Sequence, residues 1–184
     1  MNTIGQMWRA FDIMVRYSTE REVHGGMLES KQFIQGFIAD SYMDIQASRL
    51  MTIHCAEVMD KEGDARVDIS AIKVFVPAAG SRVVDRAIQM HGWRGVSGDT
   101  PLAGMYQGFR TLRLADGPDE VHRILIAKEI LKKYLEEFEG YSREEIFEKR
   151  KEKFLSIGKQ KSFKVFSDNA YWTKKDNIFN PFPI

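Results

Sequence analysis

Apolar residues recur along most of this chain at the three-to-four-residue spacing that is typical of amphipathic helices. The first such stretch comprises Ile4, Met7, Trp8, Phe11 and Val15. It predicts a helix over residues 3–19. The same spacing predicts four more helices, over residues 30–60, 68–90, 101–112 and 119–138. The alternating pattern that is typical of strands is nearly absent.

Two of the predicted helices are long, and each has a continuous apolar stripe. The stripe of the second helix comprises Phe33, Phe37, Ile38, Tyr42, Ile45, Leu50, Ile53 and Val58. Ser30 is placed to cap its first turn. The stripe of the third comprises Ile69, Ile72, Phe75, Val76, Val83, Ala87 and Met90. Pro77 lies inside that third helix and removes one backbone donor, so we expect a kink or a break near Phe75.

Glycine and proline mark the ends of several predicted helices. The pair Gly25-Gly26 breaks the chain after the first helix. Pro118 occupies the first helical position of the fifth helix, and Asp119 and Glu120 follow it in the first turn. Proline at that position and acidic residues in the first turn are both typical of a helix N-terminus.

The C-terminal part of the chain has a weaker pattern. Ser142 and Glu145 have the spacing of a capping box, which predicts a short sixth helix over residues 143–155. Residues 160–184 contain aromatic side chains without a steady period, so we expect an irregular tail.

Long helices joined by short turns predict an all-α fold, an up-down four-helix bundle with an additional C-terminal helix and an irregular tail. The net charge changes from −3 over residues 1–140 to +4 over residues 141–184, and the change coincides with the Gly140-Tyr141 break. We therefore expect a helical bundle domain over residues 1–140 and a basic C-terminal extension over residues 141–184.

Composition excludes several classes of function. The formal net charge of +1 gives no field that would attract nucleic acid, and no apolar run reaches the roughly 20 residues of a membrane span. The single cysteine, Cys55, excludes an internal disulfide, and its apolar surroundings favour a buried packing thiol. The four histidines match no zinc signature, so we expect no metal site.

Asp116 is the candidate for chemistry, because it lies on the turn between the fourth and fifth predicted helices. A carboxylate held on such a turn can act as a general base. It can equally be a helix cap that complements the positive end of the helix dipole. Spacing alone favours the cap.

Several motifs occur in order along the chain: the segment 85–97, then Asp99, Pro101-Leu102-Ala103 and Met105-Tyr106, and finally Asp-Gly-Pro-Asp-Glu-Val-His over 116–122. Together they resemble the C-terminal helical domain of the acyl-CoA dehydrogenases, in the subgroup that carries aspartate where many members carry a catalytic glutamate. The resemblance runs from about Gly5 to about Leu131. It implies a four-helix core with a further helix packed at its end.

The resemblance implies FAD-dependent α,β-dehydrogenation of an acyl-CoA thioester, a step of fatty-acid oxidation. Asp116 would remove the α-proton while the flavin N5 takes the β-hydride, and the main-chain N–H of Asp116 would polarise the thioester carbonyl. Aspartate is one methylene shorter than glutamate, which suggests a substrate shape different from that of simple straight-chain members.

The resemblance also implies a set of FAD contacts. Arg21 would pair with the pyrophosphate and Gln32 would lie near the adenosine. Gln89, Gly92 and Gly95 would form the segment that approaches the adenosine diphosphate closely.

Three further positions differ from the usual family pattern. Glu120 replaces a residue, often glutamine, that meets the FAD in many members. His24 stands where phenylalanine is usual. Trp93 stands where glycine is usual, so its indole would fill the nucleotide groove or stack within it.

A full member of the family has an N-terminal helical domain and a middle β-domain, which this sequence does not contain. We therefore expect the C-terminal domain of a truncated or split enzyme. The implied partners are the acyl-CoA substrate and an electron-transfer flavoprotein-type acceptor. We also expect self-association as a dimer or tetramer, with Phe33, Phe37 and Tyr106 among the contacts, or a partner chain that supplies the missing domains. The location would be intracellular, mitochondrial in a eukaryote and cytoplasmic in a bacterium. The alternative is a non-catalytic helical interaction or oligomerisation module that retains the fold.

Overall fold

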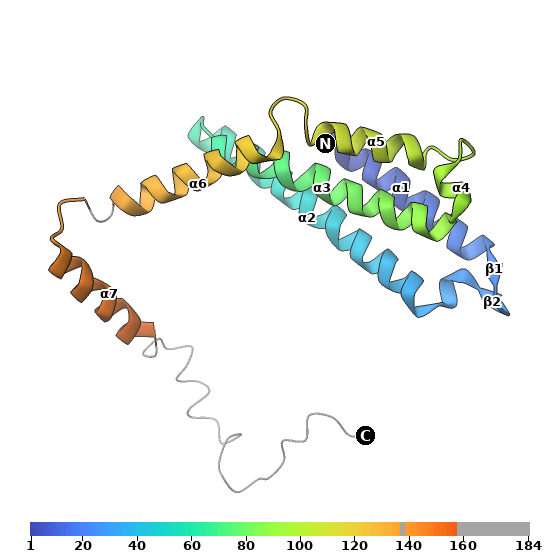
Figure 1. Cartoon of the computed structure of the whole chain (residues 1–184), viewed down its shortest axis with the longest axis horizontal. Coiled ribbons are helices and arrows are strands. Elements are labelled where there is room, and N and C mark those ends of the chain that lie inside the picture. Colours follow the sequence, from blue (N-terminus) through green and yellow to red (C-terminus); the bar gives the residue numbers. More distant parts are fainter. Residues whose placement is uncertain (137–138, 158–184) are drawn as a thin grey trace, which may run out of the picture. The chain divides into compact units, whose positions relative to one another are not determined.

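A computed structural model describes residues 1–136 and 139–157 of the chain (Figure 1). These residues form seven α-helices, α1 (Asn2–Glu20), α2 (Gln32–Glu62), α3 (Arg66–His91), α4 (Trp93–Val96), α5 (Leu102–Leu112), α6 (Asp119–Glu136) and α7 (Arg143–Ile157). The predicted all-α fold is confirmed. The tail predicted to be irregular and the last two residues of the predicted helix 119–138 lie outside the described residues.

A small hairpin separates α1 from α2. Its strands are β1 (Glu22–Val23) and β2 (Gly26–Met27), and a 3-10 helix, η1 (Leu28–Ser30), follows. His24 and Gly25 form the two-residue turn with φ values of 50° and 75°. Positive φ at both positions is what a tight turn of matching twist requires. The break predicted after α1 is therefore a β-hairpin.

The predicted cap at Ser30 is wrong. The Ser30 hydroxyl lies at the end of η1 and donates to the Met27 carbonyl at 2.7 Å. Helix α2 begins two residues later, at Gln32, and its N-cap residue Lys31 gives no side-chain hydrogen bond. The sequence pattern could not separate the 3-10 turn from the helix that follows it.

Helix α3 is the centre of the bundle, because it packs against α1, α2, α4 and α5 (Figure 1). The buried core comprises Ile4, Met7, Ala10 and Met14 of α1, Ile45 of α2, Val76, Ala79, Val83, Val84, Ala87 and Met90 of α3, and Leu102 and Phe109 of α5. Helix α3 is continuous from Arg66 to His91, so of the kink or break predicted near Phe75 the break does not occur. Proline removes only one backbone donor, and the surrounding turns of α3 are packed into the core.

Phe109 of α5 lies directly on the backbone of α3. Its side chain is fully buried, and a Cβ atom added at Gly80 would be 2.1 Å from the Phe109 ring. Any side chain at position 80 would therefore force the Phe109 ring to shift. Gly80 is needed for close approach of the two helices.

A charged cluster joins α2 to α3. Asp44 accepts hydrogen bonds from Arg82, at 2.5 Å to Nη2, and from Arg86, at 2.8 Å to Nη1. Burial alone would raise the pKa of Asp44, but the hydrogen bonds from Arg82 and Arg86 outweigh it and lower the pKa below its ordinary value.

Several positions of the predicted apolar stripes are exposed. The exposed fractions are 86% for Phe33, 47% for Tyr42, 61% for Leu50 and 41% for Ile69. Ile45 is fully buried, as predicted. Periodicity identifies the apolar positions of a helix, but it does not show which of them the chain itself covers. Of these four, Tyr42 is partly covered by α1, because its ring packs against the rings of Trp8 and Phe11.

The predicted capping box of α7 is confirmed. Ser142 N donates to Glu145 Oε2 at 2.8 Å, and Glu145 N donates to Ser142 Oγ at 3.3 Å. The chain divides into two compact units, Met1–Lys132 and Lys133–Ile184. The domain boundary predicted at residues 140–141 stays a prediction.

Gly80→Ala tests the close approach of α5 to α3. Because the new methyl group would overlap the Phe109 ring, we expect the free energy of unfolding to fall by about 1–3 kcal/mol or more. Gly108→Ala in α5 is the control, since its added Cβ would meet nothing within 4 Å. Alanine there should raise stability by about 0.5–1 kcal/mol. If urea unfolding gave both variants the same change in the free energy of unfolding, the result would contradict this packing.

Candidate active site

Asp116 lies on the turn between α5 and α6, as predicted. Its φ is 53°, and that of Gly117 is 94°, so both are in the left-handed region. Aspartate tolerates this region better than most residues, and glycine enters it without strain. Asp116 is exposed. Within the described residues its carboxylate forms no hydrogen bond or ion pair and its N–H donates no hydrogen bond, so both groups are free for a ligand.

Side chains from α3 and α6 hold this turn. Lys73 Nζ donates to the carbonyl of Leu112 at 2.6 Å and to that of Ala115 at 2.7 Å. His122 Nε2 lies 3.3 Å from the Asp116 carbonyl, and His122 Nδ1 lies 3.3 Å from Ser70 Oγ. Neither Lys73 nor His122 was predicted from the sequence to be part of the site.

An ion pair closes the two ends of the turn. Arg113 Nε donates to Asp119 Oδ2 at 2.8 Å, and Asp119 N donates to the Arg113 carbonyl at 3.2 Å. Asp119 is only 3% exposed. Its carboxylate therefore does more than complement the dipole of α6, because it also fixes the geometry of the turn. Helix α6 begins at Asp119, one residue after Pro118.

Apart from Glu120, in the first turn of α6, the residues expected to contact FAD lie elsewhere. Arg21 is the C-cap of α1, and Gln32 is the first residue of α2. Gln89 lies in the last turn of α3, and Gly92 follows that helix. Arg21, Gln32 and Gln89 are not buried, and Arg21 forms no ion pair within the described residues. All of these positions are at the end of the bundle where α1 and α3 finish and α2 begins (Figure 1).

The two glycines of this group, Gly92 and Gly95, differ in the physical reason for which glycine suits the position. Gly92 has a φ of 60°, and a Cβ atom there would meet nothing within 4 Å. A Cβ atom at Gly95 would lie 2.7 Å from the Ile88 carbonyl oxygen, so internal packing alone requires this glycine. The neighbouring Trp93 is 84% exposed, and its indole extends from the bundle surface.

The structure thus separates the candidate residues into two sets. Asp116 and Glu120 lie at one end of the bundle, near Lys73 of α3, whereas the group around Gln89 lies at the other end of α3. From Lys73 to Gln89 the helix rises roughly 24 Å at 1.5 Å per residue. Within one chain, the predicted base is therefore brought together with Glu120 but not with the other residues expected to contact FAD.

The residues of the second set fit the group that the resemblance implies. FAD carries a pyrophosphate, which needs a cation and room for close approach of the backbone. The exposed guanidinium of Arg21 and the open space beside Gly92 meet these two needs.

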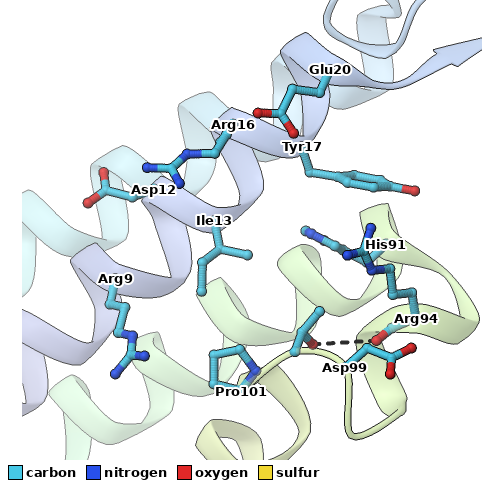
Figure 2. A pocket seen from close by; sticks show the side chains of 11 residues that line it. Arg9, Asp12, Ile13, Arg16, Tyr17, Glu20, His91, Arg94, Asp99 and Pro101 are labelled. Carbon is cyan, nitrogen blue, oxygen red and sulfur yellow. Dashed lines mark hydrogen bonds between the residues drawn. The ribbon is translucent and has the colours of Figure 1, made fainter.

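A pocket of about 430 Å³ lies beside the stacked rings of Tyr17 and His91 (Figure 2). The ring centroids are 4.0 Å apart and the planes differ by 21°. The charged residues that line the pocket are Arg9, Asp12, Arg16, Glu20, Arg94 and Asp99. Three cations and three carboxylates balance, so the lining favours neither an anionic nor a cationic ligand. None of the candidate site residues lines the pocket.

The same stack buries His91, which is 7% exposed, and joins the ends of α1 and α3. Burial lowers the pKa of His91, although the hydrogen bond between Nδ1 and the Ala87 carbonyl opposes this shift. The nearby Arg94 lowers the pKa further. His91 is therefore a packing residue that favours its neutral form.

Comparisons with known proteins show which family the chain belongs to. Residues 1–131 match the family model described as acyl-CoA dehydrogenase, C-terminal domain. The chain belongs to the acyl-CoA dehydrogenase family. It is 45% identical over 130 residues to acyl-CoA dehydrogenase family member 11 of Rattus norvegicus, a match that covers 70% of this chain and 17% of that protein. The chain thus spans about a sixth of the length of this relative.

Solved structures show the same fold. Butyryl-CoA dehydrogenase from Megasphaera elsdenii matches with a TM-score of 0.66 and 27% identity, over 70% of this chain and 34% of that one. An acyl-CoA dehydrogenase from Slackia heliotrinireducens matches with a TM-score of 0.67 and 25% identity, over 72% and 35%.

Neither a membrane span nor a metal cluster occurs among the described residues. None of their helices is both long and apolar enough to cross a membrane. In the same part of the chain, no group of three or more His, Cys, Asp or Glu residues could hold a metal ion.

The buried His91 predicts a pH dependence of stability. Because folding lowers its pKa, the unfolded chain binds the proton more readily, and stability should fall as the pH drops below about 6.5. The slope from this one group is at most about 1.4 kcal/mol per pH unit. His91→Gln should flatten the curve of unfolding free energy between about pH 7 and 5.5. A curve as steep as that of the unmodified chain would contradict the assignment.

Proposed function

We propose that residues 1–131 form the base-bearing helical domain of an FAD-dependent acyl-CoA dehydrogenase, with Asp116 as the base. The observation that carries this proposal is the turn itself. It presents the carboxylate and the N–H of Asp116, both without partners among the described residues, on a backbone fixed by side chains of α3 and α6. If Asp116 were a helix cap, its carboxylate would instead accept hydrogen bonds from the first N–H groups of α6.

Each group of Asp116 has a distinct role in the proposed reaction. The carboxylate accepts the α-proton of the acyl-CoA thioester. The main-chain N–H donates to the thioester carbonyl oxygen, which gains negative charge as the proton leaves. FAD, when bound, supplies a hydride acceptor. Because the aspartate side chain is short, the backbone position of Asp116 decides whether the carboxylate reaches Cα.

The second set of residues would hold the cofactor. Arg21 would pair with the FAD pyrophosphate and Gln32 would lie near the adenosine. Gln89, Gly92 and Gly95 would provide close backbone approach. Glu120, which belongs to the first set, would meet the FAD beside Asp116. The separation of roughly 24 Å along α3 supports a division of labour, in which the two ends of one chain serve the active sites of two subunits.

This division requires self-association, as a dimer or tetramer. Further segments or a partner chain would complete the acyl-CoA cleft and the flavin site, and an electron-transfer flavoprotein-type acceptor would reoxidise the flavin. The name of the Megasphaera elsdenii protein, a butyryl-CoA dehydrogenase, supports an acyl-CoA thioester as the substrate class.

The exposed apolar side chains of α2 favour one alternative, a non-catalytic oligomerisation module. Phe33 and Leu50 are 86% and 61% exposed and would suit a protein contact. The alternative predicts a colourless oligomer that does not respond to FAD. The flavin absorbance bands of the purified chain, alone and with a partner chain, distinguish the two functions.

Asp116→Asn tests the proposed base in a complete enzyme. In a chimera, residues 1–131 replace the matching 130-residue segment of the rat relative. Because an amide has nearly the same shape but cannot accept the α-proton, we expect the dehydrogenation rate to fall by about 10²–10⁴. Flavin content and melting temperature should stay unchanged.

Asp60→Asn, an exposed carboxylate on α2, is the matched control and should react at the unmodified rate. Turnover of a panel of acyl-CoAs by stopped-flow reduction of the flavin measures both variants. Full activity of Asp116→Asn would leave the carboxylate with a structural role only.

A further inference from the structure

The C-terminal end of α5 is held from outside by one lysine. Lys73 of α3 is half-buried, and its ammonium group donates to the carbonyls of Leu112 and Ala115 at 2.6 and 2.7 Å. The last carbonyls of a helix have no partner within it, so an ammonium group placed there satisfies them and complements the helix dipole. Lys73 therefore fixes the backbone on the N-terminal side of Asp116.

His122 fixes the carbonyl of Asp116 itself. The distances to the Asp116 carbonyl and to Ser70 Oγ, both 3.3 Å, fit the tautomer in which Nε2–H donates to the carbonyl and Nδ1 accepts from the serine hydroxyl. A Cβ atom at Gly117 would lie 3.3 Å from His122 Nε2, so this glycine leaves room for the imidazole. Two side chains thus hold consecutive carbonyls of the turn.

We propose that Lys73, assisted by His122, is a positioning residue for the base Asp116, an inference that rests on the proposed function. The left-handed backbone of Asp116 is unfavourable for a residue with a side chain and needs support from outside the turn. The short aspartate side chain cannot correct a displaced backbone. A displacement of about 1 Å at a reacting group can lower the rate about 100-fold.

A lysine that merely caps α5 would affect stability without a specific effect on the base. The chain offers a matched comparison on the same helix, because Arg82 also donates to groups on another helix but contacts Asp44 instead of the turn. Lys73→Met keeps the aliphatic stem and removes the donors. Lys73→Arg keeps a cationic side chain with N–H donors.

Amide hydrogen exchange of the 184-residue chain measures the turn directly. In Lys73→Met, we expect the amides of Leu114 and Ala115, which donate to Thr111, to exchange about tenfold faster or more, because the hydrogen bonds that hold the turn are lost. Arg82→Met should leave these amides unchanged, and Lys73→Arg should restore most of their protection. Unchanged exchange in Lys73→Met would overturn the proposal, whatever the activity.

Kinetics of the chimera then separate positioning from capping. In Lys73→Met, kcat should fall about 10- to 100-fold with KM changed less than about twofold, and Lys73→Arg should recover most of the rate. Arg82→Met should keep kcat, even if its melting temperature falls as much as that of Lys73→Met. An unchanged kcat in Lys73→Met, despite faster exchange, would overturn the proposal. Full activity of Asp116→Asn would overturn the proposed function instead, and the exchange result on the turn would stand separately.

Discussion

The arrangement of the bundle depends on the close contact between Phe109 and the backbone of α3 at Gly80. A Cβ atom at position 80 would be 2.1 Å from the ring, so α5 can lie on α3 only because this position has no side chain. Helix α5 runs back along α3 and ends beside Lys73, whose Nζ donates to the Leu112 carbonyl. That direction places the Asp116 turn at one end of α3 and leaves the chain segments around Gln89 at the other.

Much of the helical framework could be predicted from the sequence, because helix periodicity and capping are local properties. The predicted range 68–90 and the observed α3, Arg66–His91, agree closely, as do the predicted and observed capping box at Ser142. The exposure of Phe33 could not be predicted, since it depends on which elements meet in space. The short helix α4 was also missed, because one turn has no detectable period.

For the candidate site, the sequence could indicate Asp116 but not the groups that hold it. Lys73 is 39 residues from Leu112 and 42 from Ala115, and a lysine on a helix has no local signal that reports such partners. The ion pair of Arg113 with Asp119 is closer in sequence, yet the pattern indicated only a helix-dipole role for Asp119. The separation of Asp116 from Arg21 is a consequence of the fold, and no sequence motif indicates it.

In the proposed enzyme, the two ends of this domain act in the active sites of different subunits. Co-expression of an Asp116→Asn chimera with an Arg21→Ala chimera tests this division most directly, because each variant alone should have little activity. A mixed dimer would contain one site with both residues intact, so the random mixture should recover about a quarter of the unmodified rate. A mixture no more active than the two separate variants would contradict the account.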